Sequence, residues 1–174
     1  LNTLIAQLVR FKNLWDRDAS LEEVLPTLYA AHRERYDGYS LRRVCNEMHD
    51  FYRKADIKEL QKLCFRASSF PELAMLPQDA YRALVANEVD YVPLEKIRGR
   101  VSATLALIYP PGIGVVVPGE RWDERAKPML EYFLTFQESF NRFPGFNYEV
   151  QGVFQERGDG QIKFHTYVVR ESES

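Results

Sequence analysis

Apolar residues in the first half of the chain recur every three or four positions, the spacing of helices with one apolar face. In the first such segment that face consists of Leu4, Ile5, Leu8, Val9 and Leu14. Ser20 and Ser40 each stand directly before a further apolar run and are predicted to cap its first turn. Pro26 interrupts the run after Ser20, so that helix is expected to kink or restart there.

The pattern changes near Val89, where short stretches rich in β-branched residues indicate strands. Strands are predicted at 89–92, 100–109 and 114–117, followed by one long helix over about 124–142. Two further apolar stretches, separated by Arg-Gly-Asp-Gly at 157–160, are typical of a hairpin whose glycines and aspartate supply positive φ angles. We therefore predict an α+β fold, with a helical part at 1–88 and a small mixed sheet with one packed helix at 89–174.

Composition limits the class of protein without identifying it. The chain has 174 residues, 45% of them hydrophobic, and a net charge of −2, so neither a basic nucleic-acid surface nor a disordered acidic tail is indicated. No apolar run approaches the 18 or so residues of a membrane span, and no signal peptide is visible. Cys45 and Cys64 lack metal-ligand spacing and fit two free thiols in a reducing cytoplasm. Because the sequence starts at Leu1, we expect a fragment of a longer chain.

No self-contained catalytic constellation is apparent. His32, His49 and His165 belong to no zinc motif, and neither a nucleophile elbow nor a phosphate-binding glycine loop occurs, so no catalytic residue and no metal ligand is assigned. The Arg-Gly-Asp triplet is interpreted as a turn and not as an adhesion ligand. A run of aromatic residues between 132 and 146 is interpreted as core and not as a ligand cage.

The stretch "YPPGIGVVVPGERW" from Tyr109 to Trp122 is the strongest candidate for a site. Prolines and glycines form two rigid corners around a short apolar run, and these corners fix the positions of Tyr109 and Glu120. One interpretation is the pre-organised edge of a pocket, with a phenol and a carboxylate as its polar groups. The other is a β-corner that only packs, in which Arg121 neutralises Glu120 in a structural ion pair.

This stretch, with "GRVSATLALI" before it and "FPGFNYEVQGVF" after it, closely resembles the C-terminal domain of prokaryotic ornithine/lysine/arginine decarboxylases, and most of all the ornithine members. These are large pyridoxal-phosphate enzymes of the aspartate-aminotransferase fold type. The resemblance implies a domain that covers the active-site entrance, with Tyr109 and Glu120 as candidate entrance residues. It also implies partners: the remaining domains of the same polypeptide and a second copy in a homodimer or higher homo-oligomer, with neither nucleic acid nor membrane.

The family's cofactor lysine follows a histidine, and no lysine of this chain does. The resemblance therefore implies that this fragment binds no pyridoxal phosphate and is inactive alone, while the full-length enzyme converts ornithine to putrescine and CO₂. Two alternatives stay open: a fragment of a lysine or arginine decarboxylase, or a stand-alone module that binds a small molecule.

Overall fold

The computed structural model describes residues 2–109 and 112–171. They form two compact units. The first contains the N-terminal 55 residues together with 143–145, and the second contains 56–142 and the residues from 146 onward. The predicted division at residue 88 follows the change from helix to strand, which lies inside the second unit, and it stays a proposal.

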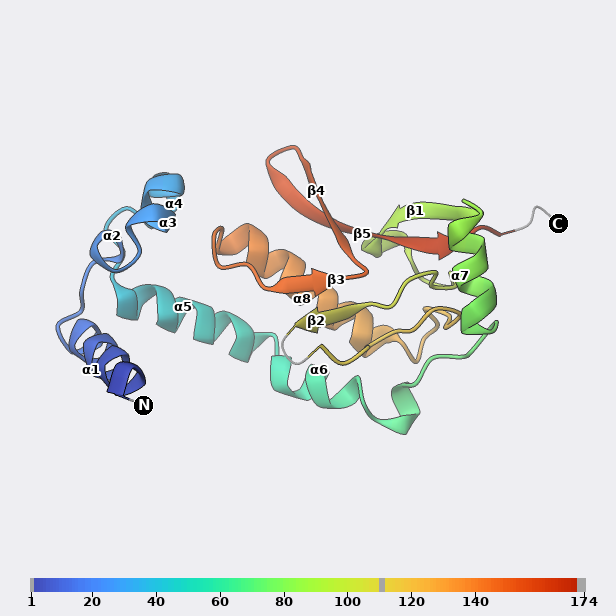
Figure 1. Ribbon diagram of the computed structural model, residues 1–174, viewed down its shortest axis with the longest axis horizontal. Coiled ribbons are helices and arrows are strands. Elements are labelled where there is room, and N and C mark those ends of the chain that lie inside the picture. Colours follow the sequence, from blue (N-terminus) through green and yellow to red (C-terminus); the bar gives the residue numbers. More distant parts are fainter. Residues whose placement is uncertain (1, 110–111, 172–174) are drawn as a thin grey trace. The chain divides into compact units, whose positions relative to one another are not determined.

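Among the described residues of the first unit, the regular elements are all helices, and one isolated β-bridge joins Ser20 to Ser40 (Figure 1). Its helices are α1 (Asn2–Asp16), α2 (Leu21–Val24), α3 (Pro26–Ala31), α4 (Arg33–Tyr36) and α5 (Leu41–Lys54). The predicted caps are confirmed: the hydroxyls of Ser20 and Ser40 accept from the amides of Glu23 and Arg43, each at 3.2 Å. Pro26 starts α3 after a break at Leu25, because proline cannot continue the preceding helix.

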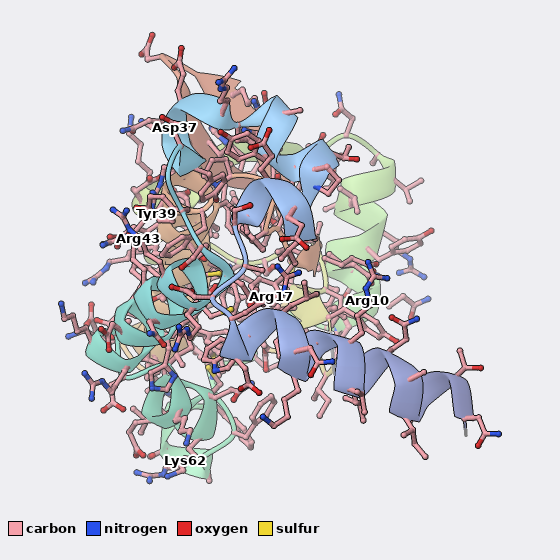
Figure 2. All side chains as sticks on the ribbon, turned by 90° about the vertical axis from the view of Figure 1, so that its left-hand side faces the viewer. Arg10, Arg17, Asp37, Tyr39, Arg43 and Lys62 are labelled. Carbon is pink, nitrogen blue, oxygen red and sulfur yellow. The ribbon has the colours of Figure 1, made fainter. Side chains whose placement is uncertain are left out.

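Buried aromatic residues hold the short return segment 143–145 in this unit. The Tyr36 hydroxyl donates to the carbonyl of Pro144 at 2.9 Å, and the rings of Phe51 and Phe143 meet edge to face at 5.7 Å. Figure 2 shows Arg43 beside Tyr39, where the guanidinium lies 4.0 Å from the ring centroid. These contacts join α4, α5 and the return segment, whereas no described residue of α1 is buried. The apolar face predicted for the first helix therefore exists but stays open to solvent.

The second unit contains α6 (Ile57–Leu63), the 3-10 turn η1 (Ala67–Ser69), α7 (Pro77–Val85), a second 3-10 turn η2 (Leu94–Lys96) and α8 (Lys127–Arg142). The long predicted helix is confirmed as α8, which begins three residues later than expected and keeps Pro128 in its first turn. The predicted aromatic core is confirmed as well. Its buried residues on α8 are Met129, Leu130, Tyr132, Phe133, Phe136, Ser139 and Phe140.

The strands are β1 (Val89–Pro93), β2 (Leu107–Tyr109), β3 (Glu149–Gln151), β4 (Phe154–Gly158) and β5 (Gln161–Val169). They form a sheet in the order β1-β5-β4 and a separate pair, β2-β3. The α+β class is confirmed, but in place of one mixed sheet the described strands make two small antiparallel ones. A tight hairpin joins β4 to β5, as antiparallel pairing allows. The long connections from β1 to β5 and from β2 to β3, both of which contain α8, also bring the second strand back antiparallel to the first.

The strand predicted over 100–109 is mostly not a strand. Only Leu107–Tyr109 forms a ladder, while Val101, Ser102 and Ala106 make single bridges to three different segments. Because the segment changes partner along its length, no second strand pairs with it continuously. The strand predicted over 114–117 is likewise reduced to one bridge, between Val116 and Ala106.

The hairpin predicted around the Arg-Gly-Asp triplet is confirmed, with one correction. Asp159 and Gly160 occupy the turn with φ of +52° and +76°. Gly158 does not have a positive φ; it is the last residue of β4 and pairs with Gln161. Two positive-φ residues suffice for a two-residue hairpin turn, so the strand ends later than the glycine pattern indicated.

Candidate functional site

The second corner of the candidate stretch is a four-residue turn from Val117 to Glu120. The Glu120 amide donates to the Val117 carbonyl at 3.1 Å, and Gly119 has a φ of +91°. Proline followed by a positive-φ glycine is typical of a type II turn. A Cβ at Gly119 would lie 2.3 Å from the Met75 carbonyl oxygen, so only glycine lets the two backbones approach. The turn is therefore fixed by both its own geometry and its neighbour.

Glu120 is half-buried and turns its carboxylate back onto this turn. Its Oε2 accepts from the Val117 amide at 2.7 Å. Burial raises the pKa of Glu120 above its usual value, the Val117 hydrogen bond opposes that shift, and the nearby Asp123 carboxylate adds to it. A half-buried carboxylate in this position has two uses: it closes the turn, and it attracts a cation that approaches it.

Arg121 does not neutralise Glu120 in the way the packing interpretation expected. Its Nε lies 3.4 Å from a carboxylate oxygen of Glu72, and its Nη1 donates to the Gly99 carbonyl at 2.8 Å. Among the residues that the structure describes, no ion pair to Glu120 is recorded. The charge of Glu120 is thus balanced mainly by a backbone amide, and not by the adjacent guanidinium.

Tyr109 ends β2, where it pairs with Glu149, and 52% of it is exposed. The chain reverses after it: the Gly112 amide donates to the Ile108 carbonyl at 3.3 Å. A Cβ at Gly112 would come within 2.8 Å of the Tyr109 ring, so the ring packs over this glycine. Pro110 and Pro111, which the sequence assigned to the first rigid corner, lie outside the described residues.

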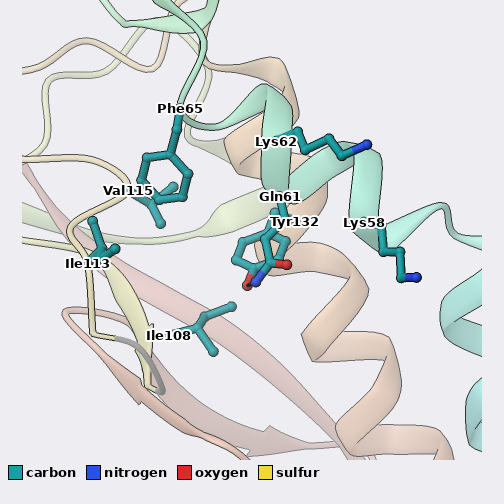
Figure 3. Close-up of a pocket in the computed structure, with 8 residues that line it drawn as sticks. All are labelled: Lys58, Gln61, Lys62, Phe65, Ile108, Ile113, Val115 and Tyr132. Carbon is teal, nitrogen blue, oxygen red and sulfur yellow. Dashed lines mark hydrogen bonds between the residues drawn. The ribbon is translucent and has the colours of Figure 1, made fainter.

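A pocket that the sequence did not reveal lies beside this stretch (Figure 3). Its volume is about 370 Å³, and it is lined by Lys58, Gln61, Lys62, Phe65, Ile108, Ile113, Val115 and Tyr132. Ile108, Ile113 and Val115 come from the candidate stretch and the strand before it, whereas neither Tyr109 nor Glu120 lines the pocket. No sequence signal indicated it, because its walls come from separate segments: α6 with Phe65 just after it, the three residues Ile108, Ile113 and Val115, and Tyr132 on α8.

The remaining candidates take structural positions. His165 on β5 stacks on Tyr91 with ring centroids 5.1 Å apart, and His49 is exposed on α5. Within residues 2–109 and 112–171 no three histidine, cysteine or acidic side chains gather closely enough to hold a metal ion. In the same residues no helix is both long and apolar enough to cross a membrane.

Comparison with known proteins identifies the group to which this chain is related. The family described as "Orn/Lys/Arg decarboxylase, C-terminal domain" matches residues 58–170. The inducible ornithine decarboxylase of Escherichia coli K12 is 46% identical over 170 residues, which are 98% of this chain and 23% of that protein. Lysine decarboxylase LdcA of Pseudomonas aeruginosa is 38% identical over 90% of this chain and 21% of that protein.

The fold agrees with the sequence comparison. A solved structure of lysine decarboxylase A from Pseudomonas aeruginosa superposes with a TM-score of 0.88 and 33% identity, covering 97% of this chain and 22% of that one. The chain thus spans less than a quarter of the length of these relatives. On both counts, this chain belongs to the Orn/Lys/Arg decarboxylase family and corresponds to its C-terminal domain.

Proposed function

We propose that this chain is the C-terminal domain of a full-length enzyme that decarboxylates ornithine to putrescine and CO₂. The observation that carries the proposal is the 46% identity, over nearly the whole chain, to a relative named as an ornithine decarboxylase. The lysine decarboxylase of Pseudomonas aeruginosa is 38% identical, which makes lysine the second candidate substrate. Both assignments concern the full-length polypeptide.

The role of the domain in that enzyme is to border the active-site entrance. Basic amino-acid substrates carry a distal cation, and a half-buried carboxylate attracts a cation more strongly than one in bulk water. Glu120 supplies such a carboxylate on a fixed turn. Tyr109 supplies an exposed phenol at the end of β2. We therefore retain both as candidate entrance residues, which need not touch each other to border one opening.

Pyridoxal phosphate, the cofactor that the family implies, does not fit the residues of this chain. The cofactor acts as an electron sink once a lysine amine has attached it to the protein. A lysine suited to that task is normally desolvated so that its amine is uncharged. Every lysine here is exposed, and none follows a histidine; they are Lys12, Lys54, Lys58, Lys62, Lys96, Lys127 and Lys163. We therefore assign the cofactor to the remaining domains.

The same domains, and a second copy of the enzyme, are the proposed partners. The apolar face of α1 supports this: Leu4, Ile5, Leu8 and Val9 are between 51% and 60% exposed. A contiguous exposed apolar face on one helix is typical of an interaction surface. Free Cys45 and Cys64 support a cytoplasmic location, because a reducing compartment keeps thiols unpaired.

Two measurements test the proposal. The 174-residue chain, incubated with pyridoxal phosphate and reduced with borohydride, should show no single stoichiometric lysine adduct and should release no CO₂ from labelled ornithine. The full-length enzyme should do both, with kcat/KM for ornithine above that for lysine and arginine. A higher kcat/KM for lysine than for ornithine would identify lysine, the second candidate, as the substrate. Activity of the chain alone would overturn the assignment of the cofactor to other domains and favour a stand-alone module.

A further inference from the structure

We propose that the pocket between α6, α8 and the side chains of Ile108, Ile113 and Val115 binds a small organic anion with an apolar body. This site has no part in the decarboxylation proposed above, and its test does not depend on that activity. A volume of about 370 Å³ lies within the range of small-molecule sites and accommodates a body of one or two rings. It is too small for a two-chain lipid.

The interior of the pocket is apolar, and the apolar residues at its mouth are exposed to water. Ile108, Val115 and Tyr132 form its buried part, each between 4% and 7% exposed. Phe65 and Ile113 stand at its mouth and remain 46% and 54% exposed. In Figure 3 Phe65, Ile113 and Val115 lie on one side of the pocket, and Lys58 and Lys62 lie on the other. A ligand with an apolar body would remove the exposed phenylalanine and isoleucine from water.

The charged residues that line the pocket are both lysines. Lys58 and Lys62 are four positions apart on α6, which places them on the same face of that helix. Lys62 lies 3.4 Å from Glu59, but Glu59 also binds Arg66 at 2.9 Å, so one carboxylate faces two cations there. No ion pair to Lys58 is recorded among the described residues. The rim therefore has an excess of positive charge.

A polar group inside the pocket favours the same class of ligand. Gln61 donates from Nε2 to the Tyr132 hydroxyl at 3.3 Å. A phenol that accepts one hydrogen bond still has its own proton to donate. Burial raises the pKa of Tyr132, so the hydroxyl keeps that proton at neutral pH. One buried donor and two lysines at the rim match a carboxylate or phosphate head on an apolar body, and they disfavour an amine.

Four ligands of one shape test the charge requirement: naphthalene-2-carboxylate, 2-naphthyl phosphate, the neutral 2-naphthamide and the cationic 2-naphthylmethylamine. Calorimetric titration at low salt should show that at least one of the anions binds more tightly than the amide, and the amide more tightly than the amine. The preferred anion identifies the head group. Added salt should weaken the binding of the anions, because it screens the lysines. Equal binding of all four, or tightest binding of the amine, would overturn the proposal.

Paired variants test the location. Lys58→Gln with Lys62→Gln should weaken anion binding about tenfold, on the scale of two partly exposed ion pairs. Lys96→Gln with Lys163→Gln removes the same charge from exposed positions outside the pocket and should leave binding unchanged. Ile113→Asp, at an exposed position where folding tolerates charge, should abolish it. Thermal melting establishes that each variant is folded.

The titration is performed on the 174-residue chain and on the full-length polypeptide that contains it. Binding to both, with the lysine dependence above, supports the proposal. Binding to the chain alone would mean that another domain fills the pocket in the enzyme, and it would overturn the site as a ligand site. If the full-length polypeptide binds the anion but does not decarboxylate ornithine, that result counts against the proposed function and not against this site.

Discussion

At the scale of single residues, the Glu120 carboxylate has two proposed roles, one in stabilising the turn and one at the active-site entrance, and each can be measured separately. Its carboxylate closes the turn by accepting from the Val117 amide, and burial raises its pKa. Because the pKa of the folded state lies above the ordinary 4.5, the fold favours the protonated form. The contribution of Glu120 to stability is therefore complete below pH 4.5 and declines as the pH rises through the folded pKa.

Two substitutions of Glu120 test this pH dependence of stability. Glu120→Gln keeps an oxygen acceptor for Val117 and removes the charge, so at pH 7 the variant should melt at or above the temperature of the parent chain. Its melting temperature should also vary less between pH 4 and pH 7. Glu120→Ala leaves the amide without that acceptor and should cost about 1 kcal/mol or more in the free energy of unfolding. A Gln variant as unstable as the Ala variant would contradict this account.

The entrance role has a separate readout in the full-length enzyme. Removing the carboxylate should raise the KM for ornithine by several-fold, on the scale of one partly screened ion pair, with kcat less affected. An unchanged KM, with the stability pattern above intact, would reduce Glu120 to a turn-closing residue. The first corner, at Tyr109, would then be the remaining candidate for the entrance.

At the scale of elements, three glycines near the β4–β5 hairpin should respond differently to alanine. A Cβ at Gly152, where φ is +71°, would lie 2.0 Å from the Leu105 carbonyl oxygen, so backbone would have to move. Gly160 has φ of +76° but open space, and Gly158 has open space without a positive φ. Alanine should therefore cost more than 2 kcal/mol at Gly152, about 1 kcal/mol at Gly160 and almost nothing at Gly158.

Urea unfolding of the three variants measures this series. The control is internal, because all three changes add the same methyl group to the same part of the chain. A cost at Gly158 equal to that at Gly160 would mean that the turn includes Gly158, as the sequence pattern first indicated. A small cost at Gly152 would contradict the close approach of 105 and 152.

Elements also show what the sequence could predict. The caps at Ser20 and Ser40, the restart at Pro26 and the apolar face of α8 depend on residues within one or two turns, so local pattern is enough. The segment 100–109 has the composition of a strand, but its hydrogen bonds depend on which distant segments reach it. The pocket was missed for the same reason, since its walls meet only in the folded chain.

At the scale of the whole molecule, the exposed apolar face of α1 is the feature that the described residues leave unexplained. Periodicity correctly assigned Leu4, Ile5 and Leu8 to one face, but it does not tell what covers that face. In the 174-residue chain nothing described does, because α1 has no buried residue. Since relatives are more than four times as long as this chain, the missing cover is expected in their other domains or in a second subunit.

Leu8→Asp tests this expectation, because it places a charge at the centre of the face. In the 174-residue chain Leu8 is 60% exposed, so the melting temperature should change by no more than a surface substitution allows, within about 0.5 kcal/mol. In the full-length enzyme the same change would bury an unpaired carboxylate at an interface. It should therefore destabilise the assembly by several kcal/mol or prevent it.

Asn13→Asp is the matched control, since it adds a carboxylate to an exposed position on the opposite, polar side of the same helix. Melting temperature and oligomeric mass should distinguish the two full-length variants: the Asn13 variant should match the parent enzyme, and the Leu8 variant should melt lower or run at lower mass. If the two variants behave alike, α1 is open to solvent in the whole enzyme. The domain would then be attached through other surfaces, and the apolar face of α1 would need another occupant.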